Sequence, residues 1–140
     1  MGRYLLDTNI IVFLVLGDSD SISHNTKTIL GDYSNQLYTN TIVVSELIQL
    51  YRIKKIKPKK YKTATEIAEA IEKELYIKIL PFTKDHLHTL SKLVLAEGHN
   101  DPADHAIISH AITEKLILVS SDRKFEHYTK QNLKFAFNKR

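Results

Sequence analysis

Acidic residues stand at four places in the sequence where a carboxylate is unusual: Asp7, Glu46, Asp104 and Asp122. The first and last of them end short apolar runs, and the other two share predicted helical faces with apolar side chains. A carboxylate on such a face is costly to bury unless it is paired or binds a metal. Several carboxylates in one crevice repel one another, and a divalent cation removes that repulsion. Oxygen ligands select hard ions, so these residues predict a Mg²⁺ or Mn²⁺ site that could activate water against a phosphodiester.

Three of these acids also have an ordinary structural explanation. Asp7 could cap the helix that follows it, which is the simpler explanation for this residue alone. Asp104 stands at the third position of a predicted helix that Asp101 caps and Pro102 begins, where an acid favours the helix dipole. Glu46 could form a salt bridge with a nearby lysine. The metal site therefore depends on whether the four acids converge.

The hydrophobic pattern indicates the elements that would position these acids. Strands are predicted at 4–6, 36–40, 77–80 and 116–119, with a half-buried edge strand at 133–137. Helices are predicted at 10–16, about 21–33, 41–53, 63–74, 83–97 and 101–115, with Gly98 following one of them and a helical turn near Phe125.

Strands that alternate with helices of ten or more residues are typical of βαβ units. We therefore expect one α/β domain over residues 1–140, a three-layer α/β/α sandwich with a central, mostly parallel sheet. If the strands before Asp7 and Asp122 are neighbours, these two aspartates lie side by side. They would then border the crevice beyond the carboxyl ends of the strands, where such sheets bind ligands.

Composition narrows the chemistry further. The chain has 140 residues and no cysteine, which excludes disulfides, thiolate metal sites and a cysteine nucleophile, and fits a reducing cytoplasm. The longest apolar run, Ile10–Leu16, is shorter than the ~20 residues of a membrane span. Serine nucleophile motifs and glycine-rich phosphate loops are absent. None of the seven histidines is expected to have a catalytic role, and no close histidine pair is expected to compete for a softer metal.

The net charge of +4 is concentrated in one segment, which holds Arg52, Lys54, Lys55, Lys57, Lys59, Lys60 and Lys62. No acidic residue occurs from Leu47 to Thr65. Such a block indicates a surface for a polyanion such as nucleic acid. A solvated loop whose lysines serve solubility explains it equally well.

Four short motifs carry a resemblance to a known family: Leu5-Leu6-Asp7-Thr8-Asn9, Ser45-Glu46-Leu47, Asp104-His105-Ala106-Ile107-Ile108 and Ser120-Ser121-Asp122-Arg123-Lys124-Phe125. In this order and spacing the sequence resembles the PIN-domain nucleases, and among them the VapC-type toxins of toxin–antitoxin pairs. The resemblance implies that the four acids form a metal site, with Asn9 and Ser120 as polar supports. These toxins usually have threonine at the position of Ser120, and serine retains the hydroxyl group. Asp101 is either a helix cap or an outer ligand of the metal, and the sequence does not decide between these roles.

The resemblance also implies a homodimer and a small cognate antitoxin that covers the site. Our first hypothesis is therefore a Mg²⁺- or Mn²⁺-dependent endoribonuclease of a type II toxin–antitoxin pair, in the cytoplasm. The alternative is a non-catalytic RNA-binding or regulatory module with the same fold. A phosphotransfer signalling domain is disfavoured, because a single aspartate, Asp7, follows the first strand where such domains place a pair.

Overall fold

The chain is described by a computed structural model that covers residues 1–140. Its sheet consists of β1 (Arg3–Leu6), β2 (Gln36–Asn40), β3 (Lys78–Leu80), β4 (Ile117–Ser120) and β5 (Lys134–Phe137). The α-helices are α1 (Thr8–Leu16), α2 (His24–Gly31), α3 (Thr41–Arg52), α4 (Ala64–Lys73), α5 (Lys84–Lys92) and α6 (Pro102–Glu114). Two 3₁₀ segments, η1 (Ser19–Ser21) and η2 (Arg123–Gln131), complete the elements.

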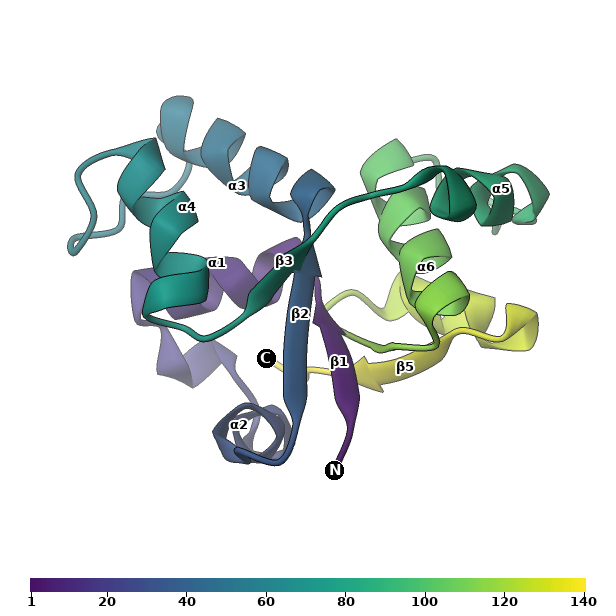
Figure 1. The fold of residues 1–140 in the computed structure, drawn as a ribbon, viewed down its shortest axis with the longest axis horizontal. Coiled ribbons are helices and arrows are strands. Elements are labelled where there is room, and N and C mark those ends of the chain that lie inside the picture. The colour runs from purple at the N-terminus through teal and green to yellow at the C-terminus, as the bar shows by residue number, and fades with distance from the viewer.

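The five strands are all parallel and lie in the order β3-β2-β1-β4-β5. Helices α1, α3 and α4 cover one side of the sheet, and α5 and α6 cover the other (Figure 1). The predicted α/β/α sandwich is confirmed, and its sheet is parallel throughout. The chain builds the sheet outward from β1 to β3 and then crosses back to place β4 on the other side of β1. The carboxyl ends of β1 and β4 therefore flank a topological switch point, where parallel sheets form their ligand crevices.

The central strand and the first helix are buried because their sequences are apolar on all sides. Leu5 and Leu6 of β1 have no exposed surface, and neither have Ile10 and Ile11 of α1. A parallel strand with helices on both faces is expected to have this continuous apolar character. β1 is thus fixed between β2 and β4, with Leu6 opposite Val119. This register sets the two strand ends side by side.

Several predicted elements differ from the structure in extent, most of them by one or two residues at an end. The helix predicted at about 21–33 is the short turn η1 followed by α2, whose first turn is capped by Ser23. The strand predicted at 77–80 begins at Lys78. The turn predicted near Phe125 is the longer 3₁₀ segment η2, which Asp122 caps.

The helix predicted at 83–97 ends at Lys92, so Gly98 does not follow its last turn. Beyond the cap residue Leu93 the backbone bonds to side chains of η2 instead of to its own helix: Val94 exchanges two hydrogen bonds with Gln131, and the Ala96 amide donates to the Tyr128 hydroxyl. Gly98 has a φ of +77°, and it turns the chain back towards α6. None of the helices has the length and apolar character needed to cross a membrane.

Candidate active site

The predicted acids converge on one cavity at the switch point. Asp7 and Asp122 follow the neighbouring strands β1 and β4, Glu46 comes from α3, and Asp104 comes from the first turn of α6. The cavity has a volume of about 380 Å³, and its polar lining residues are Asp7, Thr8, Asn9, Glu46, Lys55, Asp101, Asp104, Asp122 and Arg140. The structure thus brings together every acid expected to bind metal, with Asp101 beside them.

Asp7 is both a helix cap and a buried member of the cluster. One carboxylate oxygen accepts a hydrogen bond of 2.8 Å from the Thr8 amide at the start of α1. The other oxygen accepts from the Ser120 hydroxyl at 2.7 Å and from the Asn9 amide at 3.3 Å. Burial raises the pKa of Asp7 to about 7 despite these donors, and the charges of Asp104 and Glu46 add to the effect. The carboxylate is therefore held firmly in place but is costly to ionise.

Asn9 and Ser120 lie where supporting residues were expected. The Asn9 amide donates to the Ser120 hydroxyl oxygen at 3.1 Å, and its carbonyl oxygen accepts from the Ser121 amide at 3.2 Å. The same hydroxyl oxygen accepts from the Asp122 amide at 3.1 Å. These bonds tie the loop after β4 to the start of α1, so they fix the spacing of Asp7 and Asp122.

Glu46 is held by a residue that the sequence reasoning did not single out. The Thr8 hydroxyl donates to a Glu46 carboxylate oxygen at 2.7 Å, across 38 positions of the chain. No lysine forms an ion pair with Glu46, so the salt bridge considered from the sequence is absent. Burial raises the pKa of Glu46, and the nearby charges of Asp101 and Asp104 raise it further.

Asp104 is oriented by His99, which the sequence reasoning also missed. The His99 Nε2 atom lies 2.9 Å from Asp104 Oδ2, and its Nδ1 atom lies 2.8 Å from the Tyr128 hydroxyl. That hydroxyl accepts from the Ala96 amide and so directs its own proton to His99 Nδ1. The neutral ring then carries its proton on Nε2 and donates it to Asp104. Burial nevertheless raises the pKa of Asp104, and it outweighs the lowering effect of this bond.

Asp101 and Asp122 lie at the more exposed edge of the cavity. Each uses one oxygen to cap the segment that follows: Asp101 accepts from the Ala103 amide at 2.9 Å, and Asp122 accepts from the Lys124 amide at 2.9 Å. The second oxygen of each carboxylate makes no hydrogen bond within the chain. The cap expected at Asp101 is confirmed, and the residue also lines the cavity.

The donor set of this cavity fits a divalent cation. Five carboxylates line it, yet no lysine or arginine forms an ion pair with any of them. The ligands on offer are oxygens, which suit Mg²⁺ and Mn²⁺. Burial raises the pKa of Asp7, and a cation bound beside it would favour the ionised carboxylate.

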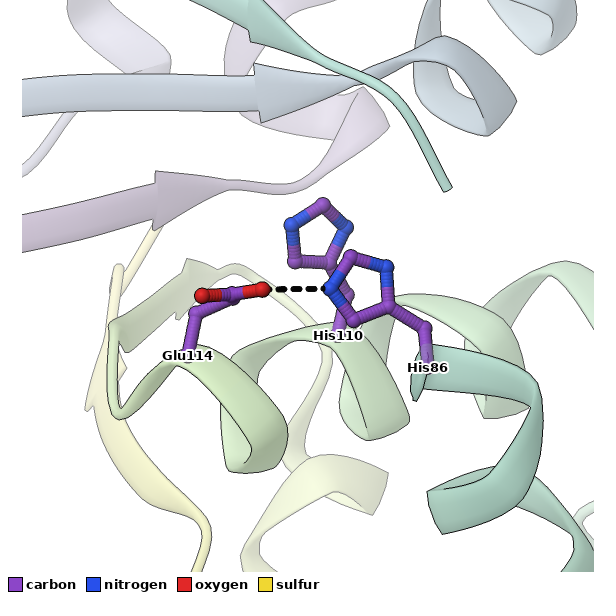
Figure 2. A group of neighbouring side chains, drawn as sticks. All are labelled: His86, His110 and Glu114. Carbon is purple, nitrogen blue, oxygen red and sulfur yellow. Dashed lines mark hydrogen bonds and ion pairs between the residues drawn. The ribbon is translucent and has the colours of Figure 1, made fainter. Parts of the chain in front are cut away.

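A second group that could attract a metal contains two histidines that the sequence reasoning did not compare with each other. His86 of α5 and His110 of α6 stack with ring centroids 3.8 Å apart, and His86 Nε2 lies 2.8 Å from a Glu114 carboxylate oxygen (Figure 2). The two histidines stand 24 positions apart on different helices. Their pairing was missed because the sequence reasoning compared only histidines that are close along the chain.

Hydrogen bonds on the far side of these rings disfavour metal binding. His86 Nδ1 accepts from the Thr83 amide at 2.9 Å, and His110 Nδ1 accepts from the Asn40 side-chain amide at 3.2 Å. A neutral ring whose Nδ1 accepts carries its proton on Nε2, so neither Nε2 atom offers a lone pair. Burial also lowers the pKa of His110 to about 4, and its Nε2 has no partner. The group instead pins α5 to α6, because His86 is the one fully buried side chain of α5.

The basic segment divides between different surfaces. Lys55 lines the acidic cavity, whereas Arg52, Lys54 and Lys57 line a separate neighbouring one. Lys60 pairs with Glu74 at 2.6 Å. Lys59 lines a groove beside the end of α1. The segment is therefore spread over several surfaces, and its role in RNA binding stays a prediction. Arg140 is a further cation at the acidic cavity that the sequence reasoning missed.

Comparisons with known proteins reveal a family match and similar folds. The model of the PIN domain family matches residues 4–131. A structure described as VapBC2 from Rickettsia felis bound to a DNA fragment from its promoter has a chain that is 23% identical, with 97% of this chain and 98% of that chain covered at a TM-score of 0.67. VapBC from Salmonella typhimurium, bound to DNA, is similar at 19% identity, 98% coverage of both chains and a TM-score of 0.67.

A third structure, VapBC-1 from nontypeable Haemophilus influenzae, is 19% identical over 96% of this chain and 97% of that chain, with a TM-score of 0.64. At these identities the solved structures establish a shared fold. A search among curated proteins found no match.

Proposed function

The chain belongs to the PIN domain family, and on that premise we propose that it is a metal-dependent endoribonuclease. One observation carries the proposal: five carboxylates, among them the buried Asp7, line a single cavity that contains no ion pair with lysine or arginine. A site of this kind is stable only when a cation or protons neutralise it. Residues 1–140 would form a single catalytic domain.

Each part of the cavity has a proposed role. Asp7, Glu46, Asp104 and Asp122 would hold Mg²⁺ or Mn²⁺, with Asp101 as an outer partner. When bound, the metal would lower the pKa of water and offset charge on the phosphodiester. The chain's own donors, Thr8 Oγ1, Asn9 Nδ2, Ser120 Oγ and His99 Nε2, orient the carboxylates that receive it. Lys55 and Arg140 at the cavity would attract the RNA backbone.

We further propose that the chain is the toxin of a type II toxin–antitoxin pair and acts in the cytoplasm. The proposal is supported by three similar solved structures described as VapBC, in each of which the match covers nearly the whole of one chain. A small antitoxin would then cover the acidic cavity, and the toxin would form a homodimer. Co-expression with the product of an adjacent small reading frame should yield a stable complex that lacks nuclease activity.

The activity can be tested directly on the purified chain. After treatment with EDTA and removal of the chelator, it should leave end-labelled structured RNA intact. Addition of Mg²⁺ or Mn²⁺ should restore cleavage, and excess EDTA should stop it again. RNA binding without cleavage at any metal concentration would instead support a non-catalytic RNA-binding module.

Replacing His99 with Ala should weaken the metal site without touching a ligand. Asp104 would lose the donor that fixes its orientation, and such outer partners are typically worth about 10- to 100-fold in metal affinity or activity. We expect a loss of this size in Mn²⁺ affinity, measured by electron paramagnetic resonance. Tyr128→Phe is the matched control, because it retains the ring and removes only the hydroxyl that binds His99 Nδ1; it should cause a smaller loss in the same direction. Unchanged Mn²⁺ affinity in a folded His99→Ala variant would exclude this positioning role.

A further inference from the structure

We propose that a second cavity, next to the acidic one, binds a single unstacked base of the RNA substrate. It lies between the end of α3 and the segment that leads to α4, and its volume is about 400 Å³. The inference rests on the proposed ribonuclease function and names the form of RNA that the site would take: a nucleotide in a single-stranded loop or end.

The floor of this cavity is apolar and partly aromatic. Ile56, Pro58 and Tyr61 line it and are buried, and the half-buried Tyr51 adds a second aromatic ring. Aromatic side chains are the usual platforms for unstacked bases, because every base has a π-face. An apolar floor offers no favourable contact to a bare phosphate or to a duplex backbone.

The rim of the cavity is cationic. Arg52, Lys54, Lys57 and Lys62 line it and are exposed, and no carboxylate is among the lining residues. None of these four cations forms a salt bridge within the chain. The charge suits the phosphates on either side of a base, and it disfavours a neutral apolar partner.

A turn at the end of α3 links this base cavity to the acidic cavity. Lys54 has a φ of +62°, and the Lys55 amide donates to the Leu50 carbonyl at 3.0 Å, which closes the helix end. As a result Lys54 lines the base cavity while Lys55 lines the acidic one, and Ile56 lines both. One strand of RNA could therefore place a base on the apolar floor and a nearby phosphate at the acids.

Hydrogen bonds hold the frame of the base cavity before any ligand arrives. The Tyr51 hydroxyl donates to the Lys62 carbonyl at 2.6 Å and bridges the two ends of the segment. The Lys62 amide donates to Glu66 at 3.0 Å, and the Lys62 ammonium donates to the Lys59 carbonyl at 3.2 Å. A frame fixed in this way lowers the entropy lost when a ligand binds.

The test measures binding and cleavage in the same variants of the full chain. Binding is measured in EDTA, which prevents cleavage, with two probes: a single-stranded oligoribonucleotide and an abasic oligomer of the same length. Tyr51→Leu should weaken binding of the oligoribonucleotide by about tenfold, since stacking contributes ~1–3 kcal/mol per base. It should leave binding of the abasic oligomer within about twofold. Tyr51→Phe is the matched control: it also loses the bond to Lys62 but retains the ring, so base-dependent binding should persist.

The charge variants separate a base site from a simple anion patch. Lys57→Ala should weaken both probes and lower the slope of log affinity against log salt by about one. Lys27→Ala, which removes an exposed lysine of α2 at the opposite end of β2 (Figure 1), should change neither. Equal affinity of wild-type protein for the two probes, or equal losses in Tyr51→Leu, would overturn the base cavity. Displacement of the oligoribonucleotide by millimolar inorganic phosphate would also overturn it.

Cleavage assays distinguish this inference from the proposed function. With Mn²⁺ present, Tyr51→Leu should raise KM by about tenfold and leave kcat within about twofold, because the ring acts on binding alone. If wild-type protein cleaves RNA and Tyr51→Leu leaves both constants unchanged, the base cavity is wrong and the nuclease stands. If no protein cleaves but Tyr51→Leu still loses base-dependent binding, the nuclease is wrong and the base cavity stands.

Discussion

Asp7→Asn is expected to reduce metal-dependent RNA cleavage on the order of 1,000-fold while making the metal-free protein more stable. The loss follows because a bound metal supplies several kcal/mol of transition-state stabilisation, and each ~1.4 kcal/mol is a factor of ten in rate. The gain in stability follows because Asp7 is buried and its carboxylate is costly to ionise, whereas an amide carries no charge. A purely structural aspartate would show the opposite pattern, with reduced stability and unchanged activity.

The two effects are measured on one preparation. Cleavage of labelled RNA is followed under single-turnover conditions with Mn²⁺, and thermal unfolding is followed at pH 8 with EDTA. Asp85→Asn removes an exposed acid of α5 and serves as the control, which should match wild type in both assays. Cleavage by Asp7→Asn at the wild-type rate would exclude Asp7 from the active site.

Without metal, Asp7 should also make stability depend on pH. Its pKa is about 7 in the folded chain against an ordinary value of 3.8. Below pH ~4 the carboxyl group of Asp7 is protonated in both the folded and the unfolded chain, so it does not lower the free energy of unfolding there. As pH rises towards 7, Asp7 ionises in the unfolded chain but stays protonated in the folded chain. The free energy of unfolding therefore falls by on the order of 4 kcal/mol. The pKa values of Glu46 and Asp104 are also raised, so these residues act in the same direction.

A difference measurement isolates this effect from opposing groups. The pKa of His110 is lowered to about 4, so this residue destabilises the folded chain as pH falls below about 6.5. The difference in free energy of unfolding between Asp7→Asn and wild type cancels that contribution. It should grow from near zero at pH 4 to its maximum at pH 7 to 8, as measured by urea unfolding in EDTA. Saturating Mn²⁺ should stabilise wild type above pH 7 and leave the variant almost unchanged, whereas a difference independent of pH would mean that Asp7 ionises freely in the folded chain.

The pattern of apolar residues was enough to predict the architecture of the sheet and the strand-end position of Asp7. A parallel strand buried on both faces leaves a continuous apolar run, and Tyr4–Leu6 and Leu116–Val119 are such runs. Because these strands proved to be neighbours, the acids that follow them meet. The helix cap expected at Asp7 is confirmed, because one carboxylate oxygen accepts from the Thr8 amide. The other oxygen accepts from Ser120, and the residue also lines the acidic cavity, where its role as a metal ligand stays a prediction.

Contacts between distant segments were beyond sequence reasoning. Thr8 and Glu46 meet across two elements. His99 reaches Asp104 from the end of an irregular segment, whose first part, up to Glu97, the apolar pattern assigned to a helix. Val94 misled that assignment, because it is largely exposed and does not mark an inward helical face. The block of lysines gave no sign that its members would line different cavities. That separation depends on the turn at Lys54.

The central claim is that the acidic cavity, and not the histidine group on α5 and α6, holds the metal that cleaves RNA. Anomalous diffraction from crystals of the chain grown with Mn²⁺ tests it most directly, because it locates the ion. The expected result is a peak within coordination distance of Asp7 and at least one of Glu46, Asp104 and Asp122. No peak in that cavity at saturating Mn²⁺, or a sole peak beside His86, His110 and Glu114, would contradict it.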